Sequence, residues 1–263
     1  MEWKTYFLWI LGGATVVATL TAIRAATCPA GWRPWVCYQI AVMHRLLFAR
    51  CKMVNPCPFP EDGPAIIVAN HTSSVDPVLL WHRHFAQFRK PHLRVIGFMM
   101  AKEFYEQNAL ARCVCRAMES IPVERTGRDI APTRAALKRL DEGKLLGIFP
   151  EGRLNLWTPD ERLLPGGTGV AWLAIKSKAP VIPVFIHNAP RKNSMLRSFF
   201  VRTTVTLTYG KPIDLSIWYD RKPGHAELAE VTDLIMKSIA ELGGIAFTPV
   251  NESESQKASH HDE

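Results

Sequence analysis

The chain has 263 residues, of which 48% are hydrophobic and 21% charged, a composition typical of a globular protein with one sizeable domain and an appendage. Its net charge is +8, and setting aside the tail from Asn251, which has four acidic residues and one basic residue, raises this to +11. A basic body attracts phosphates, and the lack of zinc-finger spacing or of interleaved aromatic and basic runs argues against nucleic acid. A membrane or a small phosphorylated substrate is therefore the favoured partner.

The first predicted element is a membrane-anchoring helix. Residues 5–23, between Lys4 and Arg24, carry no charge, and as a helix they would span roughly 28 Å, close to the ~30 Å hydrocarbon core of a bilayer. A cleaved signal peptide and a buried helix are the alternatives, although the apolar stretch is longer than a usual signal h-region. Residues 35–54 mix apolar, aromatic and basic side chains, which indicates an interfacial helix or an ordinary amphipathic helix on the domain. We therefore assign residues 1–56 to a membrane anchor and interfacial helix.

From Pro60 onward, segments typical of strands and helices alternate. Strands are predicted at 64–70, 93–99, 119–123, 144–149, 180–186 and 201–209, and helices near 78–89, 103–117, 130–142, 167–177 and 225–242. Several of these strands are continuously apolar, which predicts that both of their faces are covered. The fold class predicted for residues 57–250 is α/β, a largely parallel mixed sheet flanked by helices that follows the N-terminal membrane-anchoring segment. Residues 251–263 are polar and acidic and are predicted to be disordered.

The six cysteines form no C-x-x-C pair and no ligand set with histidines. In a chain of this length they predict reduced thiols that pack as small hydrophobic groups, not a disulfide framework. We expect no metal ion, and a site that faces a reducing, cytosolic compartment.

A histidine and a carboxylate follow the first predicted strand of the domain, as His71 and Asp76. A turn of this length can fold back so that Asp76 accepts a hydrogen bond from Nδ1 of His71, which leaves Nε2 free as a general base. Asp76 followed by Pro77 also resembles a helix N-cap with proline at the first helical position. A serine nucleophile at Ser73 or Ser74 is disfavoured, because both residues lie inside the turn that joins His71 to Asp76.

A second polar cluster follows the predicted strand 144–149, as Glu151, Gly152 and Arg153. In open α/β sheets, sites gather at the carboxyl ends of the strands. The two polar clusters are therefore predicted to face one another.

Five blocks in chain order resemble the glycerophospholipid acyltransferases, and most closely the 1-acyl-sn-glycerol-3-phosphate (lysophosphatidate) acyltransferases. The blocks are Asn70-His71 with Asp76-Pro77 (the HX4D pattern), Ala101-Lys102-Glu103, residues 121–125 (Ile-Pro-Val-Glu-Arg), residues 149–153 (Phe-Pro-Glu-Gly-Arg) and residues 179–184 (Ala-Pro-Val-Ile-Pro-Val). The resemblance covers roughly residues 60–215. It implies an enzyme that moves a fatty acyl group from acyl-CoA or acyl carrier protein to the sn-2 hydroxyl of 1-acylglycerol 3-phosphate and forms phosphatidate.

The resemblance also implies roles for individual residues. His71 would be the general base and Asp76 would set its tautomer, with no covalent acyl-enzyme. Arg125 would bind the substrate phosphate, and Lys102 would add positive charge to the same pocket, although a solvated lysine beside Glu103 is equally compatible. Glu151 would hold a glycerol hydroxyl and Gly152 would allow close approach of the backbone. No cofactor is implied beyond the acyl donor, which is a substrate.

One block departs from the family pattern. The lysophosphatidate enzymes usually read Glu-Gly-Thr-Arg-Ser, whereas this chain has Arg153 one position earlier and Leu154 where the arginine is expected. The alternatives are therefore acylation of another lysolipid, or a non-catalytic lipid-binding protein on the same scaffold. The expected partners are a lysolipid, an acyl donor (including acyl carrier protein) and the membrane surface, at the cytoplasmic face of a membrane, which in a bacterium is the plasma membrane.

Overall fold

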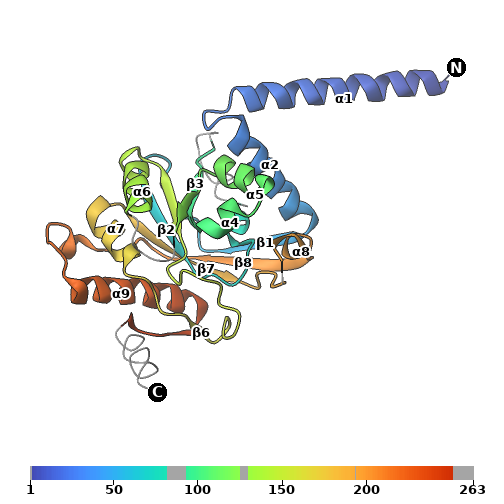
Figure 1. Cartoon of the computed structure of the whole chain (residues 1–263). Coiled ribbons are helices and arrows are strands. Elements are labelled where there is room, and N and C mark those ends of the chain that lie inside the picture. The colour runs from blue at the N-terminus through green and yellow to red at the C-terminus, as the bar shows by residue number, and fades with distance from the viewer. Residues whose placement is uncertain (1, 82–92, 125–129, 193, 251–263) are drawn as a thin grey trace.

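The computed structural model describes residues 2–81, 93–124, 130–192 and 194–250. Its centre is a seven-stranded sheet with the strand order β1-β8-β7-β2-β5-β3-β4 (Figure 1). The strands are β1 (Ala49–Val54), β2 (Ala65–Ala69), β3 (Ile96–Ala101), β4 (Ile121–Val123), β5 (Leu145–Ile148), β7 (Val181–His187) and β8 (Thr203–Tyr209). Strands β7, β2, β5, β3 and β4 run parallel, whereas β8 is antiparallel to β7 and parallel to β1. The predicted α/β class with a largely parallel mixed sheet is confirmed.

Helices cover both faces of this sheet (Figure 1). One core contains side chains of α2 (Trp32–Leu47), α3 (Asp76–Trp81) and α5 (Ala109–Ala117), and the other contains side chains of α6 (Ala131–Asp141), α7 (Gly169–Ser177) and α9 (His225–Gly243). Shorter elements are α4 (Lys102–Glu106), α8 (Met195–Phe199), a 3₁₀ turn (Ser216–Trp218), and a parallel pair made of β6 (Arg162–Leu163) and β9 (Ala246–Phe247).

Strand β2 shows why its residues are continuously apolar. Ile67 belongs to the core formed with α2 and α3, whereas Ile66 and Val68 belong to the core formed with α6, α7 and α9. Because successive side chains of a strand point to opposite faces, a strand covered on both sides needs apolar residues at every position. Strand β2 is also the central strand of the sheet. The polar residues that follow it therefore lie at the carboxyl edge of the sheet, near the middle of that edge.

The N-terminal helix α1 (Glu2–Ala26) projects away from the domain (Figure 1). The window Trp9–Ala26 is long and apolar enough to cross a membrane, and none of it is buried in the protein. At 25 residues the helix is about 37 Å long, sufficient for a ~30 Å hydrocarbon core. The helix is thus a candidate membrane anchor.

The helix predicted over 35–54 is confirmed only in its first part; that it is interfacial stays a prediction. Helix α2 ends at Leu47, and residues 49–54 form β1, which pairs with β8. Ala49 and Cys51 are buried while Arg50 and Lys52 are exposed, and this alternation is the two-residue period of a strand. The sheet therefore begins before the domain boundary expected at residue 57.

Other boundaries differ locally. The helix predicted over 103–117 is divided into α4 and α5, because the Asn108 side chain accepts a hydrogen bond from the Ala111 N–H and caps a new helix. The helix predicted near 78–89 begins as α3 and is described as far as Trp81; the remainder, like the tail from Asn251, lies outside the described residues.

Candidate active site

His71 and Asp76 form a hydrogen-bonded pair just beyond the carboxyl end of β2. Nδ1 of His71 lies 3.0 Å from Oδ2 of Asp76, and the same oxygen accepts from the backbone N–H groups of Thr72 at 2.9 Å and Ser73 at 2.8 Å. All three donors precede Asp76 in the chain, so this oxygen organises the turn. With the proton on Nδ1, the ring donates to Asp76 and leaves Nε2 as an acceptor.

The imidazole ring of His71 is held by an aromatic stack. The ring of Phe149, the first residue after β5, stacks on that of His71 with a centroid distance of 4.1 Å and an interplanar angle of 15°. Phe98 of β3 in turn stacks on Phe149 with a centroid distance of 5.6 Å. The His71 side chain keeps 20% of its surface exposed, whereas Asp76 is fully buried. The imidazole is thus fixed in orientation but still open to a substrate.

Glu151 fixes the backbone of His71. Its Oε1 accepts from the His71 N–H at 2.8 Å, its Oε2 accepts from the Leu164 N–H at 2.9 Å, and the residue is only 7% exposed. Burial raises the pKa of the Glu151 carboxyl, and the two backbone hydrogen bonds oppose that shift. On the other side of His71, its carbonyl accepts from the Asn155 N–H at 2.7 Å. The loop after β5 therefore holds the backbone of His71 through both its N–H and its carbonyl.

Two further residues of the turn bind the neighbouring strand and loop. The Asn70 side chain exchanges two hydrogen bonds with the backbone of Ile186 in β7, at 2.7 and 3.1 Å. The Ser73 hydroxyl donates to the Pro190 carbonyl at 2.5 Å. These bonds attach the His71 turn to β7 and to the loop that follows it, and they occupy the hydroxyl of Ser73, one of the two serines in the turn.

Sequence reasoning missed Asn70, Phe149 and Asn155 as supports of the histidine. Asn70 and Phe149 each stand at the end of a buried strand, which is the signal that could have indicated them. The contact made by Asn155 depends on the path of a loop, so nothing in its residue type predicts it.

Lys102, Gly152 and Arg153 lie at the same edge of the sheet. Lys102 begins α4 directly after β3, and its Nζ lies 2.5 Å from Oε1 of Glu124, so its charge is paired. Gly152 has a φ of +64°, a conformation that favours glycine. Its N–H donates to the Phe149 carbonyl and so closes the turn after β5. Arg153 is exposed. Arg125 lies outside the described residues.

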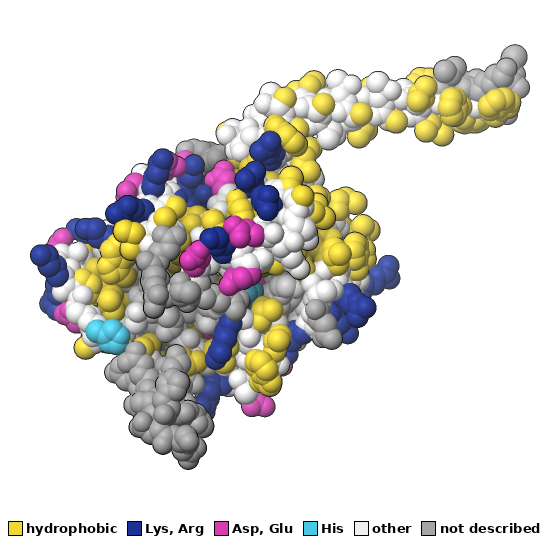
Figure 2. Space-filling view, in the orientation of Figure 1, with side chains coloured by type: hydrophobic (Ala, Val, Ile, Leu, Met, Phe, Trp, Pro, Cys, Tyr) yellow, Lys and Arg dark blue, Asp and Glu magenta, His cyan; other side chains and the backbone are white. Residues whose placement is uncertain are grey.

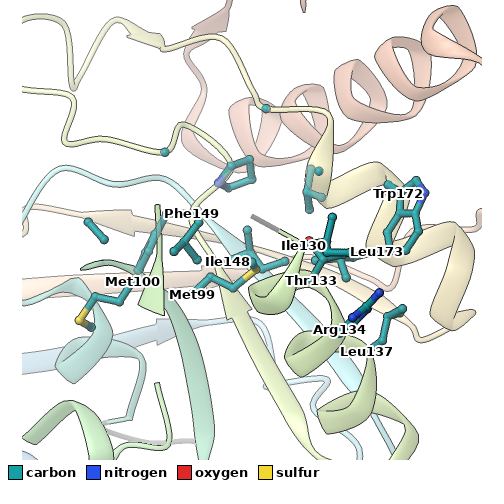
Figure 3. Close-up of a pocket in the computed structure, with 17 residues that line it drawn as sticks. Met99, Met100, Ile130, Thr133, Arg134, Leu137, Ile148, Phe149, Trp172 and Leu173 are labelled. Carbon is teal, nitrogen blue, oxygen red and sulfur yellow. The ribbon is translucent and has the colours of Figure 1, made fainter. Parts of the chain in front are cut away.

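A cavity of about 650 Å³ opens beside this cluster (Figure 3). Its walls are mainly apolar and come from the ends of β3 and β5 and from helices α6 and α7; they include Met99, Met100, Ile148, Phe149, Leu137, Trp172 and Leu173. Thr133 and Arg134 of α6 supply polar groups. Because Phe149 also stacks on His71, the cavity and the histidine share a wall. The size is that of a site for a small ligand or an alkyl chain.

The glycine-rich entry to α7, residues 165–169, has a packing role. A Cβ on Gly166 would come within 2.8 Å of Thr232 and Met236 on α9, so only glycine allows this close approach. The Gly167 N–H donates to the Pro150 carbonyl at 2.9 Å, which connects the start of α7 to the loop that carries Glu151.

Comparison with known proteins gives concordant results. A family model described as acyltransferase matches residues 50–187, slightly more than half of the chain. The 1-acyl-sn-glycerol-3-phosphate acyltransferase of Bacillus subtilis is 26% identical over 191 residues, which cover 73% of this chain and 87% of that protein. The N-acylphosphatidylethanolamine synthase of Arabidopsis thaliana is 26% identical over 128 residues, 48% of this chain and 44% of that protein. The fold is similar to the solved 1-acyl-sn-glycerophosphate (LPA) acyltransferase of Thermotoga maritima, with a TM-score of 0.59, 20% identity, and coverage of 89% of this chain and 93% of that one.

Proposed function

The chain belongs to the acyltransferase family, and on this basis we propose that it is a glycerophospholipid acyltransferase that acylates the sn-2 hydroxyl of 1-acylglycerol 3-phosphate and forms phosphatidate. The observation that carries the proposal is the His71–Asp76 pair, with Nδ1 and Oδ2 3.0 Å apart, at a sheet edge beside a largely apolar cavity. Such an arrangement suits a reaction in which an alcohol attacks an activated acyl group.

The reaction needs one base and no enzyme nucleophile. Nε2 of His71 takes the proton of the sn-2 hydroxyl as its oxygen attacks the thioester carbonyl of the acyl donor. The tetrahedral intermediate collapses, the C–S bond breaks, and the proton on His71 passes to the departing thiolate. The Asp76 carboxylate holds the ring in the tautomer that accepts at Nε2 and stabilises the imidazolium that forms.

The phosphate of the acceptor would be bound by cations at the same edge. Lys102, Arg125 and Arg153 follow β3, β4 and β5, whose carboxyl ends are adjacent in the sheet. Because Lys102 is already paired with Glu124, we assign the main phosphate contacts to Arg125 and Arg153, whose guanidinium groups offer rigid forks of donors. The cavity would take an alkyl chain. In this arrangement α1 anchors the enzyme in a membrane, with the catalytic domain at the cytoplasmic face, where the acyl donors are found.

An acceptor panel tests the proposed substrate. Purified full-length chain, supplied with acyl-CoA or acyl carrier protein thioesters, should convert 1-acylglycerol 3-phosphate to phosphatidate. Lysophosphatidylcholine and lysophosphatidylethanolamine should react much more slowly, because esterification of the phosphate removes charge and covers the oxygens that the arginines bind. Faster turnover of a lysolipid with a larger headgroup would favour the alternative raised by the position of Arg153. Vesicle binding without turnover on any donor would indicate a non-catalytic lipid-binding protein.

Glu151 is proposed to position His71 and not to bind the substrate. Both of its oxygens already accept backbone N–H groups and the side chain is almost fully buried. In Glu151→Gln, one of these N–H groups would face an amide NH₂, so the His71 backbone should shift. Because small displacements of a catalytic group can cost about 10²-fold, we expect kcat to fall by up to about this factor with little change in KM.

Steady-state kinetics at varied acceptor concentration separate the two roles of Glu151. A residue that holds the glycerol hydroxyl would mainly raise KM, and that outcome would contradict the positioning role. The exposed Glu230 of α9 provides the control, since Glu230→Gln should leave both constants unchanged.

A further inference from the structure

A second, smaller pocket lies between the end of α7 and the loop that leads into α9. Its volume is about 250 Å³. One wall has Trp172, Lys176 and Lys178, from α7 and its C-terminal cap, and the other has Tyr219 and Arg221, which follow the 3₁₀ turn. The pocket therefore brings two aromatic side chains and three cations together from segments that are distant in the sequence.

The two walls of the pocket are joined by a buried contact and by an ion pair. Trp218 of the 3₁₀ turn is only 8% exposed and belongs to the same core as Leu173 and Ile175 of α7. At the surface, Nζ of Lys178 lies 2.7 Å from Oδ1 of Asp220. The walls are therefore held together both in the core and at the rim of the pocket.

The pocket carries more positive charge than its acidic residue can neutralise. Asp220 is paired with Lys178, whereas Lys176 and Arg221 have no ion-pair partner among the residues that the structure describes. Three cations and one carboxylate leave a net charge of +2. Figure 2 shows Lys and Arg side chains gathered at the left margin of the domain, where Figure 1 places α7 and the loop before α9. An anionic group is the complementary ligand.

The two aromatic side chains narrow the class of anion. Trp172 and Tyr219 are both partly buried, and both line the pocket. Stacking on aromatic side chains is a main contribution to the binding of nucleic-acid bases, because every base has a flat π face. Guanidinium and ammonium groups bind phosphate through charge-assisted hydrogen bonds. Rings and cations in one pocket are therefore complementary to a nucleotide.

The pocket lies at the edge of the sheet opposite His71. Helix α7 leads into β7, whose first residue, Val181, pairs with Ile66 near the start of β2. Ile213, in the segment before the 3₁₀ turn, also bridges to Val181. His71 follows the other end of β2, a strand of five residues that is about 16 Å long. A nucleotide in this pocket would therefore lie away from the imidazole.

Trp172 lies between this pocket and the larger cavity beside the active site. Its side chain lines both of them. Figure 3 shows Trp172 on α7, at the end of the larger cavity away from Phe149. The smaller pocket is thus a neighbour of that cavity and has its own polar groups.

We propose that this pocket is an accessory nucleotide-binding site, separate from the site of acyl transfer. The base would stack on Trp172 or Tyr219, and Lys176 and Arg221 would bind the phosphates. The volume is below that of pockets for drug-sized molecules, which suits a single nucleotide. A free nucleotide and the nucleotide part of coenzyme A share this chemistry.

Photolabelling locates the site without relying on turnover. The full-length protein in detergent is irradiated with azido-ADP, and the labelled peptides are identified by mass spectrometry. We expect labels in the segments 172–178 and 219–223, and an excess of ADP should prevent them. Labels confined to other segments, such as the loop after β5, or labels that ADP does not prevent, would overturn the proposal.

Competition against the same label defines the ligand. Adenosine lacks the phosphates and pyrophosphate lacks the base, so each should compete about tenfold less well than ADP. Equal competition by pyrophosphate would refute a nucleotide site, because the rings would then contribute nothing. Stronger competition by ADP than by coenzyme A identifies a free nucleotide as the ligand, and the reverse order identifies the nucleotide part of coenzyme A.

Two substitutions in the pocket test the role of its cations. Lys176→Gln combined with Arg221→Gln should raise the Kd for ADP about tenfold, since charge-assisted hydrogen bonds to phosphate are lost. Lys138→Gln combined with Lys237→Gln changes the net charge equally at exposed positions outside the pocket, and should leave the Kd unchanged.

Equilibrium dialysis with radiolabelled ADP measures these dissociation constants. The same Kd in the first pair of substitutions and in the wild type would overturn the proposal. Because every readout is the binding of a nucleotide, the result holds or fails independently of the proposed acyl transfer.

Discussion

Replacement of His71 by alanine is expected to lower kcat for acyl transfer by about 10²- to 10⁴-fold, the usual contribution of a general base. The fold should persist, because the bonds that attach this position to the domain are made by its backbone, through Glu151 and Asn155. The loss of the ring removes a stack on Phe149 and one of the three donors to Asp76, but the Thr72 and Ser73 N–H groups still donate to that carboxylate. Initial rates of phosphatidate formation together with thermal unfolding of the same preparations measure both effects.

A second histidine controls for nonspecific effects of the substitution. His225 is exposed at the start of α9, far along the chain from the site, and His225→Ala should retain full activity. If the His71→Ala enzyme unfolds at the wild-type temperature and still turns over at the wild-type rate, His71 takes no part in the reaction.

Replacement of Asp76 by asparagine is expected to lower kcat by about 10²- to 10⁴-fold while leaving the fold in place. The amide oxygen can take the place of Oδ2 and accept from His71, Thr72 and Ser73, and the NH₂ group can take the place of Oδ1, which has no hydrogen-bond partner among the described residues. What is lost is the negative charge that stabilises an imidazolium next to it.

This substitution separates catalysis from organisation of the turn. The structure does not show the helix cap expected from the sequence, because the Asp76 carboxylate accepts from residues before it and not from N–H groups of α3. Asparagine keeps an oxygen acceptor at this position, so near wild-type rates in Asp76→Asn would assign the residue to holding the turn alone. Asp76→Ala, which removes the oxygen that accepts from His71, Thr72 and Ser73, should lower stability as well as rate and provides the comparison.

Sequence reasoning predicted the sheet well where periodicity is strong. The continuously apolar segments around Ile67, Ile148 and Ile182 became β2, β5 and β7, because strands covered on both faces need such residues. The prediction failed at β1, where Arg50 and Lys52 alternate with buried residues. This segment was predicted to continue the amphipathic helix before it. This short edge strand forms because it pairs with β8, which lies some 150 residues further along the chain.

The site was predictable in its chemistry and less so in its supports. The spacing of His71 and Asp76 allowed the observed pairing, because a short turn can be judged from the sequence alone. Glu151 was expected to contact the substrate, since its residue type indicates an acceptor but not which donors reach it. Its two backbone donors come from residues 80 positions before it and 13 positions after it, and such long-range contacts are fixed only by the fold.

The reversed direction of β8 has a consequence for where the chemistry takes place. Had β8 run parallel to β7, its seven residues would have carried α8 to the opposite edge of the sheet, about 23 Å from its present position. Antiparallel pairing instead puts α8 and the His71–Asp76 pair at one edge of the sheet. An acceptor that approached the imidazole from this edge would therefore meet the connection between β7 and β8, which the Ser73 hydroxyl already joins to the His71 turn.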